Sequence, residues 1–162
     1  MDDLFYMNRA LELAKEAAAQ GEVPVGCVIV RQGQIVAEGR NCRETEKTAL
    51  GHAEIQAIDA ACKALGGWRL WDCTLYVTLE PCPMCAGAII NARIPRVVYG
   101  AGDDKCGACG SVCNLFEMNF NHKPQVTTGV LEAESKALLE EFFRALRVTL
   151  RSRPKWQKPQ EK

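Results

Sequence analysis

Several common sequence features are missing, and each absence excludes a class of protein. No apolar run approaches the about 20 residues that a membrane-spanning helix needs. The first residues, Met1-Asp2-Asp3, are acidic and lack the basic start of a secretory signal. The 20 basic residues balance the 20 acidic ones, so overall charge favours no class of partner. We therefore expect a cytoplasmic protein with no membrane partner.

Histidine is scarce and cysteine abundant, with two and nine residues in a chain of 162. An odd number of cysteines without a secretory signal argues against a disulfide framework. We therefore expect reduced thiols, some of which bind a metal while most fill the core.

The apolar pattern alternates between helix and strand along the chain. It predicts helices over the first twenty residues, over 52–65 and 81–92, and from about Leu139 to just before Pro154. Strands are expected as a hairpin within 25–39 and at 73–80, 96–100 and 125–130. Such alternation is typical of a three-layer α/β/α domain, which we expect to span residues 1–152.

The C-terminal end of the chain is basic although the whole chain is neutral. From Arg144 onward there are seven basic residues and one acidic residue, Glu161, a local charge of 7 − 1 = +6. We expect residues 153–162 to form a basic tail, either a solvated end or a segment that contacts phosphate.

The stretch TLEPCPMCAG contains Cys82 and Cys85 at the expected start of a helix. Three-residue spacing places both sulfurs on one face, and the positive end of the helix favours thiolates, the form that binds zinc. His52 begins another expected helix, so one nitrogen and two sulfur ligands could meet at one end of the sheet. Three protein ligands leave one position for water, which is typical of a catalytic site.

The residues alone leave other interpretations of this pair open. His122 as a fourth ligand would make the site structural, while a thiol redox pair or two buried cysteines would need no metal. A catalytic site also requires a group that moves protons. Glu54 is the carboxylate nearest to His52 in sequence, but positions 52 and 54 of a regular helix point to different sides. Glu80 therefore stays a second candidate.

The motif His52-Ala53-Glu54 followed by Pro81-Cys82-Pro83-Met84-Cys85 resembles the signature of the zinc-dependent nucleobase deaminases. The chain is similar in particular to the bacterial tRNA adenosine deaminases, which convert the wobble adenosine, position 34, to inosine. The similar segments cover most of residues 1–150: EVPVGCVIV, Asn41, HAEI, LYVTLEPCPMCAGAIINARIPRVVYGA, GACGS and FFRALR.

This resemblance implies a cytidine-deaminase-like fold with a mixed five-stranded sheet, in a chain that forms a homodimer. It implies one zinc ion per chain on His52, Cys82 and Cys85, and Glu54 as the catalytic proton shuttle for a zinc-activated water. The implied partner is a tRNA anticodon stem-loop, in particular that of tRNA-Arg with an ACG anticodon. The implied substrate contacts are Asn41, Asp103, Lys105, Phe143, Arg144 and Arg147.

Two alternatives to this function remain at the level of the sequence. The same zinc motif would serve a deaminase of a free nucleobase or nucleoside, such as guanine, cytosine or cytidine. A zinc-stapled interaction module would need a fourth protein ligand. The loop cysteines Cys106, Cys109 and Cys113 are expected to be small packing residues, although their spacing also allows a second metal or redox site.

Overall fold

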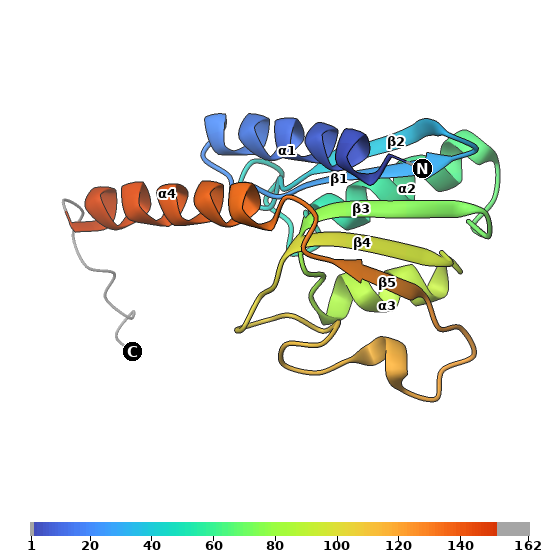
Figure 1. The fold of residues 1–162 in the computed structure, drawn as a ribbon. Coiled ribbons are helices and arrows are strands. Elements are labelled where there is room, and N and C mark those ends of the chain that lie inside the picture. The colour runs from blue at the N-terminus through green and yellow to red at the C-terminus, as the bar shows by residue number, and fades with distance from the viewer. Residues whose placement is uncertain (1, 152–162) are drawn as a thin grey trace, which may run out of the picture.

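A mixed five-stranded sheet forms the middle layer of the molecule (Figure 1). The computed structural model describes residues 2–151, so the expected tail at 153–162 lies outside the described residues. The sheet order is β2-β1-β3-β4-β5; β1 pairs antiparallel with β2 and β3, and β3, β4 and β5 are parallel. The strands are β1 (Gly26–Arg31), β2 (Gln34–Arg40), β3 (Cys73–Leu79), β4 (Arg96–Ala101) and β5 (Gln125–Thr128).

Helices cover both faces of this sheet, which confirms the predicted three-layer architecture. They are α1 (Asp3–Ala19), α2 (Ala53–Leu65), α3 (Pro83–Asn91) and α4 (Glu132–Arg151), with a 3-10 turn η1 at Leu115–Glu117. Helices α1 and α4 lie on one face, α2 and α3 on the other, and α4 projects beyond the sheet (Figure 1). No helix among residues 2–151 is long and apolar enough to cross a membrane.

The alternation of side chains along β1 explains the two cores. Cys27 and Ile29 belong to the cluster packed against α2 and α3, whereas Val28 and Val30 pack with α1. Because successive strand residues point to opposite faces, a strand that is apolar throughout must be covered on both sides. Cys27 is fully buried, as expected for a packing residue.

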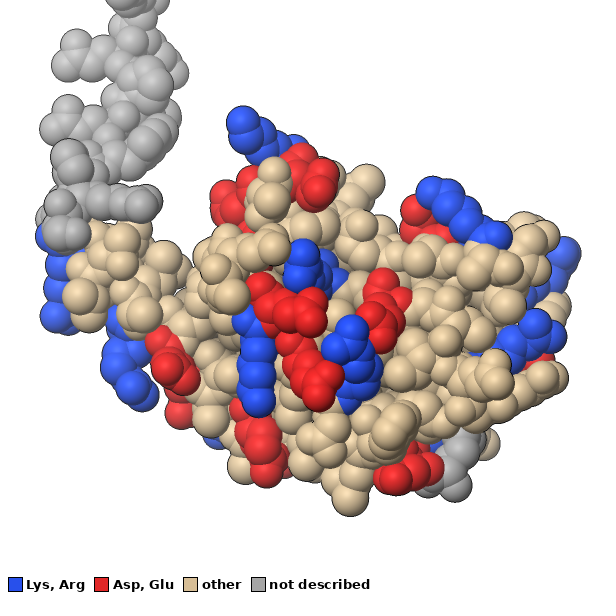
Figure 2. All heavy atoms as spheres, turned by 90° about the horizontal axis from the view of Figure 1, so that it is seen from above, with Lys and Arg blue, Asp and Glu red and all other residues tan. Residues whose placement is uncertain are grey.

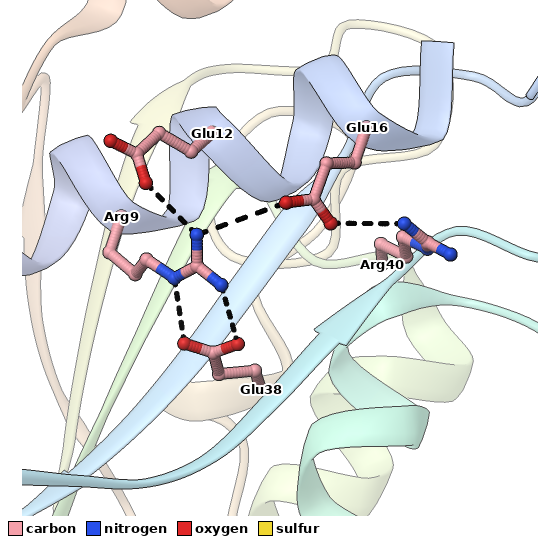
Figure 3. A network of polar contacts seen from close by, with 5 residues as sticks. All are labelled: Arg9, Glu12, Glu16, Glu38 and Arg40. Carbon is pink, nitrogen blue, oxygen red and sulfur yellow. Dashed lines mark hydrogen bonds and ion pairs between the residues drawn. The ribbon is translucent and has the colours of Figure 1, made fainter. Parts of the chain in front are cut away.

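Ion pairs fasten α1 over the outer strand β2 (Figure 3). The guanidinium of Arg9 donates to both oxygens of Glu38, at 2.7 and 2.8 Å, and also contacts Glu12 and Glu16. Arg40 donates to Glu16 at 3.0 Å. Seen from above, acidic and basic side chains are interleaved on this face (Figure 2), so exposed pairs of modest individual strength form a network.

The strand directions bring four chain segments to one edge of the sheet. Since β2 and β3 both run antiparallel to β1, they point the same way, and β4 and β5 run parallel to β3. The carboxyl end of β2 leads toward α2, that of β3 into α3, and that of β5 into α4. The loop after β4 begins at this edge too, so residues far apart in sequence can form one site there.

Gly39 on β2 fixes how closely α2 approaches the sheet. A Cβ atom at this position would overlap the carbonyl oxygen of Ala53 and lie 2.7 Å from the backbone nitrogen of Ala57. Only glycine fits, because the neighbouring atoms belong to the helix backbone. The first turn of α2 is therefore set by a backbone contact.

We expect Gly39→Ala to lower the free energy of unfolding by about 1–3 kcal/mol, because the added methyl group must push α2 from the sheet. Urea unfolding followed by circular dichroism measures this change. Gly67→Ala is the matched control, since a Cβ there has no atom within 4 Å. Equal stability of the two variants would contradict the close approach of α2.

Candidate metal centre and pocket

Two helix N-termini bring the three predicted ligands together. His52 is the N-cap residue of α2 and Cys82 that of α3, while Cys85 lies in the first turn of α3. The Nδ1 atom of His52 lies 3.5 Å from the Sγ of Cys82 and 3.4 Å from the Sγ of Cys85. Among residues 2–151 these three make the one group of at least three potential metal ligands whose donor atoms converge.

The donor set fits a tetrahedral metal ion. Zinc–nitrogen and zinc–sulfur bonds of about 2.1 and 2.3 Å place N and S about 3.6 Å apart on tetrahedral geometry, close to the separations found here. The fit needs no large movement of His52 or either cysteine. A thiophilic divalent ion with one remaining position is therefore compatible with the site.

Hydrogen bonds prepare one of the two sulfurs as a thiolate. The Cys85 thiol, helped by His52, lowers the pKa of Cys82 to about 4. Bonding to Cys82 together with burial raises the pKa of Cys85, and bonding to Cys82 also raises that of His52. A bound metal would displace the proton that the sulfurs share.

Glu54 reaches the same place as His52, which the helical spacing did not predict. His52 has an extended backbone (φ −88°, ψ 148°) and precedes the helix, so the rule for positions i and i+2 of a helix does not apply. The Glu54 side chain is 4% exposed, lines the same cavity and interacts with Cys85. Burial raises the pKa of its carboxyl to about 6, which suits a group that exchanges protons near neutral pH.

Glu80, the other candidate for proton transfer, is in a different situation. It borders the cavity, but both of its oxygens accept hydrogen bonds from the loop after β4. Burial acts to raise its pKa, whereas hydrogen bonds from Ser111 and three backbone N–H groups lower it overall. Glu80 therefore stays ionised, and both of its oxygens are engaged in hydrogen bonds with the loop.

A cavity of about 660 Å³ opens beside the three ligands. One wall is formed by the segment before β1 and the loop after β2, one by the loop after β4, and the third by α4. Of the predicted substrate contacts, this cavity is lined by Asn41, Asp103, Lys105, Phe143 and Arg147. The size is typical of a pocket for a small molecule or a single nucleotide.

Arg144 does not line this cavity, and several lining residues were not predicted. On α4, the cavity face is formed by Leu139, Phe143, Leu146 and Arg147, at three- and four-residue steps. Arg144 follows Phe143 by about 100° around the helix and therefore leaves that face. Helical spacing could have identified the two leucines. Other residues that the sequence analysis missed are Val23, Val25, Arg43, Leu79, Gly102 and Asp104.

The remaining candidate ligands lie elsewhere. Nε2 of His122 is 2.7 Å from the carbonyl oxygen of Ile94, and His122 is not among the convergent ligands. Cys109 is buried, while Cys106 and Cys113 are exposed, so the expected packing role holds only for Cys109. In the described part of the chain these three cysteines form no convergent ligand group. The fourth-ligand and second-metal hypotheses therefore find no support.

Comparison with known proteins agrees with this arrangement. The sequence model of the MafB19-like deaminases matches residues 1–147. A tRNA-specific adenosine deaminase of Bacillus subtilis (strain 168) is 53% identical over 146 residues, covering 90% of this chain and 91% of the relative.

Solved structures show the same fold. One, from studies of A-to-I editing by tRNA:A34 deaminases at the wobble position of transfer RNA, superposes with a TM-score of 0.80 at 44% identity. The match covers 83% of this chain and 99% of that one. A guanine deaminase from Bacillus subtilis superposes with a TM-score of 0.63 at 34% identity, over 99% of each chain.

We expect the protein to bind one equivalent of cobalt(II), a probe whose thiolate complexes absorb light strongly. Cys85→Ser should lose this absorbance, because a hydroxyl is a poor ligand for a thiophilic ion. The double variant Cys106→Ser/Cys113→Ser is the matched control and should bind cobalt like the unmodified protein. A second equivalent that disappears in this control would instead indicate a metal site in the loop.

Proposed function

Because the chain belongs to the MafB19-like deaminases and to the tRNA-specific adenosine deaminases, we propose that it deaminates the wobble adenosine of tRNA to inosine. The observation that carries this proposal is a buried carboxylate, Glu54, beside three convergent metal ligands in a nucleotide-sized cavity. The reaction consumes one water and releases ammonia from C6 of the adenine.

We assign one zinc ion per chain to His52, Cys82 and Cys85. Nitrogen and sulfur donors in a three-ligand set suit zinc with an open position. When bound there, zinc would activate a water for attack on C6 of the base. Because the site offers no convergent fourth protein ligand in residues 2–151, chemistry is favoured over a purely structural role.

Glu54 moves the protons in this proposal. Its carboxylate accepts a proton from the attacking water and delivers it to N1 of the adenine. It then passes the second proton of that water from the new C6 hydroxyl to the amino group, which leaves as ammonia while the hydroxyl oxygen becomes the C6 carbonyl. A pKa raised to about 6 by burial keeps proton uptake and release both accessible near pH 7. Glu80 takes no part, since its oxygens are already hydrogen-bonded.

Asn41, Phe143 and the basic half of α4 are proposed to receive the RNA. An adenine in a loop is partly unstacked, so extruding it into the pocket costs only a few kcal/mol. Asn41 at the pocket would contact the extruded nucleotide, and Phe143 offers a ring on which a base can stack. Phosphate contacts are assigned to the basic residues after Glu141, where α4 carries no acid: Arg144, Arg147 and Arg151.

Asp103 and Lys105, two loop residues that were predicted to contact RNA, differ in whether the side chain is available for such a contact. Asp103 Oδ1 accepts hydrogen bonds from the backbone N–H groups of Lys105 and Cys106, at 3.0 and 3.2 Å, so part of its role is to shape the turn. The exposed side chain of Lys105 borders the cavity and is the better candidate for a phosphate contact.

The proposed partner is an anticodon stem-loop, in particular that of tRNA-Arg with an ACG anticodon. This choice rests on the resemblance to the wobble-editing family. The homodimer and the cytoplasmic location also follow from sequence reasoning and stay predictions.

Deamination of guanine is the second candidate function, since a guanine deaminase of known structure aligns with almost the whole chain. Identity is higher to the tRNA deaminases, at 53% and 44% against 34%. The face of α4 that lines the cavity is apolar and basic, and a single free base would not need so large a contact surface.

We expect inosine at position 34 when the protein acts on a transcript of tRNA-Arg with an ACG anticodon, and no ammonia from free guanine, adenosine, cytosine or cytidine. Nucleoside mass spectrometry and an ammonia assay measure the two results. The same transcript with G at position 34 is the control. Ammonia from guanine with an unchanged transcript would overturn the RNA assignment while keeping the zinc chemistry.

We expect Glu54→Ala to lower kcat by at least about 10²-fold, the usual contribution of general acid–base catalysis, while zinc content stays at one per chain. Glu46→Ala, at an exposed glutamate, is the control. Metal analysis and single-turnover kinetics separate the two effects. Near-normal turnover in Glu54→Ala would assign proton transfer to another group.

A further inference from the structure

The loop between Ala101 and Asn114 forms one wall of the pocket, and a single buried carboxylate holds it. We propose that Glu80 is a positioning residue for this wall: it ties both ends of the loop to the end of β3, two residues before Cys82. The inference rests on the proposed function for its effect on RNA, but the tie itself can be measured without substrate.

Four donors converge on Glu80, whose side chain is 2% exposed. Its Oε1 accepts from the backbone N–H of Asp103 at 3.1 Å and from the Ser111 hydroxyl. Its Oε2 accepts from the backbone N–H groups of Cys109 and Ser111, at 3.0 and 3.1 Å. The carboxylate thus joins the start of the loop to a segment six to eight residues later.

The backbone between these anchors is shaped to enclose the carboxylate. A Cβ atom at Gly107 would overlap Glu80 Oε2, so this position admits only glycine without rearrangement. The N–H of Ala108 donates to the carbonyl of Pro81 at 2.9 Å, and the N–H of Glu80 donates to Ala101 at 2.8 Å. The loop is therefore built around Glu80.

Saturation of its acceptors explains why Glu80 positions the loop and does not exchange protons. A carboxylate offers about four lone-pair sites, and Glu80 has four donors in place. Departure of the side chain would leave the buried N–H of Cys109 without its acceptor, which is costly. Catalysis by Glu80 would require breaking the wall of the pocket.

The turn that this tie immobilises faces the cavity. The cavity is lined by Asp103, Asp104, Lys105 and Cys106 of this turn and also by Phe143 and Arg147 of α4. Holding the turn fixes the distance across the mouth of the pocket and presents Lys105 to the RNA backbone. Glu80 therefore contributes to substrate binding through Lys105 without touching the substrate.

Glu80→Gln tests the tie directly. The side-chain amide keeps the shape, but its NH₂ group must face a donor, so at least one contact becomes repulsive. We expect amide hydrogen exchange at Asp103, Cys109 and Ser111 to become at least about 10-fold faster, while β1 and β3 exchange as before. Exposed Glu117→Gln is the matched control and should leave these amides unchanged. Unchanged exchange in Glu80→Gln would overturn the inference.

A double-mutant cycle tests the link to RNA. Lys105→Ala alone should raise KM for the stem-loop substrate, and Glu80→Gln should raise KM more than it lowers kcat, with zinc content retained. In the Glu80→Gln background, Lys105→Ala should have clearly less effect, because Lys105 is already misplaced. Fully additive effects would show that Glu80 does not act through Lys105.

The test still decides the role of Glu80 if the Glu80→Gln variant does not fold or if the stem-loop is not a substrate. If Glu80→Gln does not fold, Ser111→Ala removes only the hydroxyl donor, and faster exchange confined to this loop would support the tie, whereas unchanged exchange would contradict it. If the stem-loop is not a substrate, the exchange measurements still decide the role of Glu80, and only the proposed function fails.

Discussion

The site depends on one constraint, the arrival of four strand ends at the same edge of the sheet. Because β2, β3, β4 and β5 all point to that edge, two helix N-termini, one loop and α4 must share it. His52 and Cys82 are the cap residues where α2 and α3 begin, so residues thirty positions apart become neighbours. The positive ends of the two helices favour the thiolates that a metal needs.

Two buried glutamates at this edge of the sheet, Glu54 and Glu80, differ in pKa and in hydrogen bonding. Burial raises the pKa of Glu54, which also lines the cavity. Glu80 receives four hydrogen bonds and stays ionised. Burial and hydrogen bonding thus shift the pKa values of two identical side chains in opposite directions.

Much of this could be predicted from the sequence, since periodic apolar residues and the ligand motif are local signals. The three-layer fold was predicted and is confirmed. The structure also brings His52, Cys82 and Cys85 together, while their role as metal ligands stays a prediction. The third helix was expected two residues too early, because Cys82 caps the helix and Pro83 is its first residue. The orientation of Glu54 depended on the extended backbone of His52, and the hydrogen bonds of Glu80 on a loop 23 to 31 residues away. Such contacts leave no local periodicity to detect.

X-ray absorption at the zinc edge of the purified protein counts the ligands around the metal and so shows whether the site keeps an open position. We expect two sulfur atoms, one imidazole nitrogen and one further light atom that is not histidine, the arrangement of an open catalytic site. Cys85→Ser should lose a sulfur from this shell, while His122→Ala should leave the spectrum unchanged. A second imidazole or a third sulfur would contradict the account, since it would close the position at which the substrate water must bind.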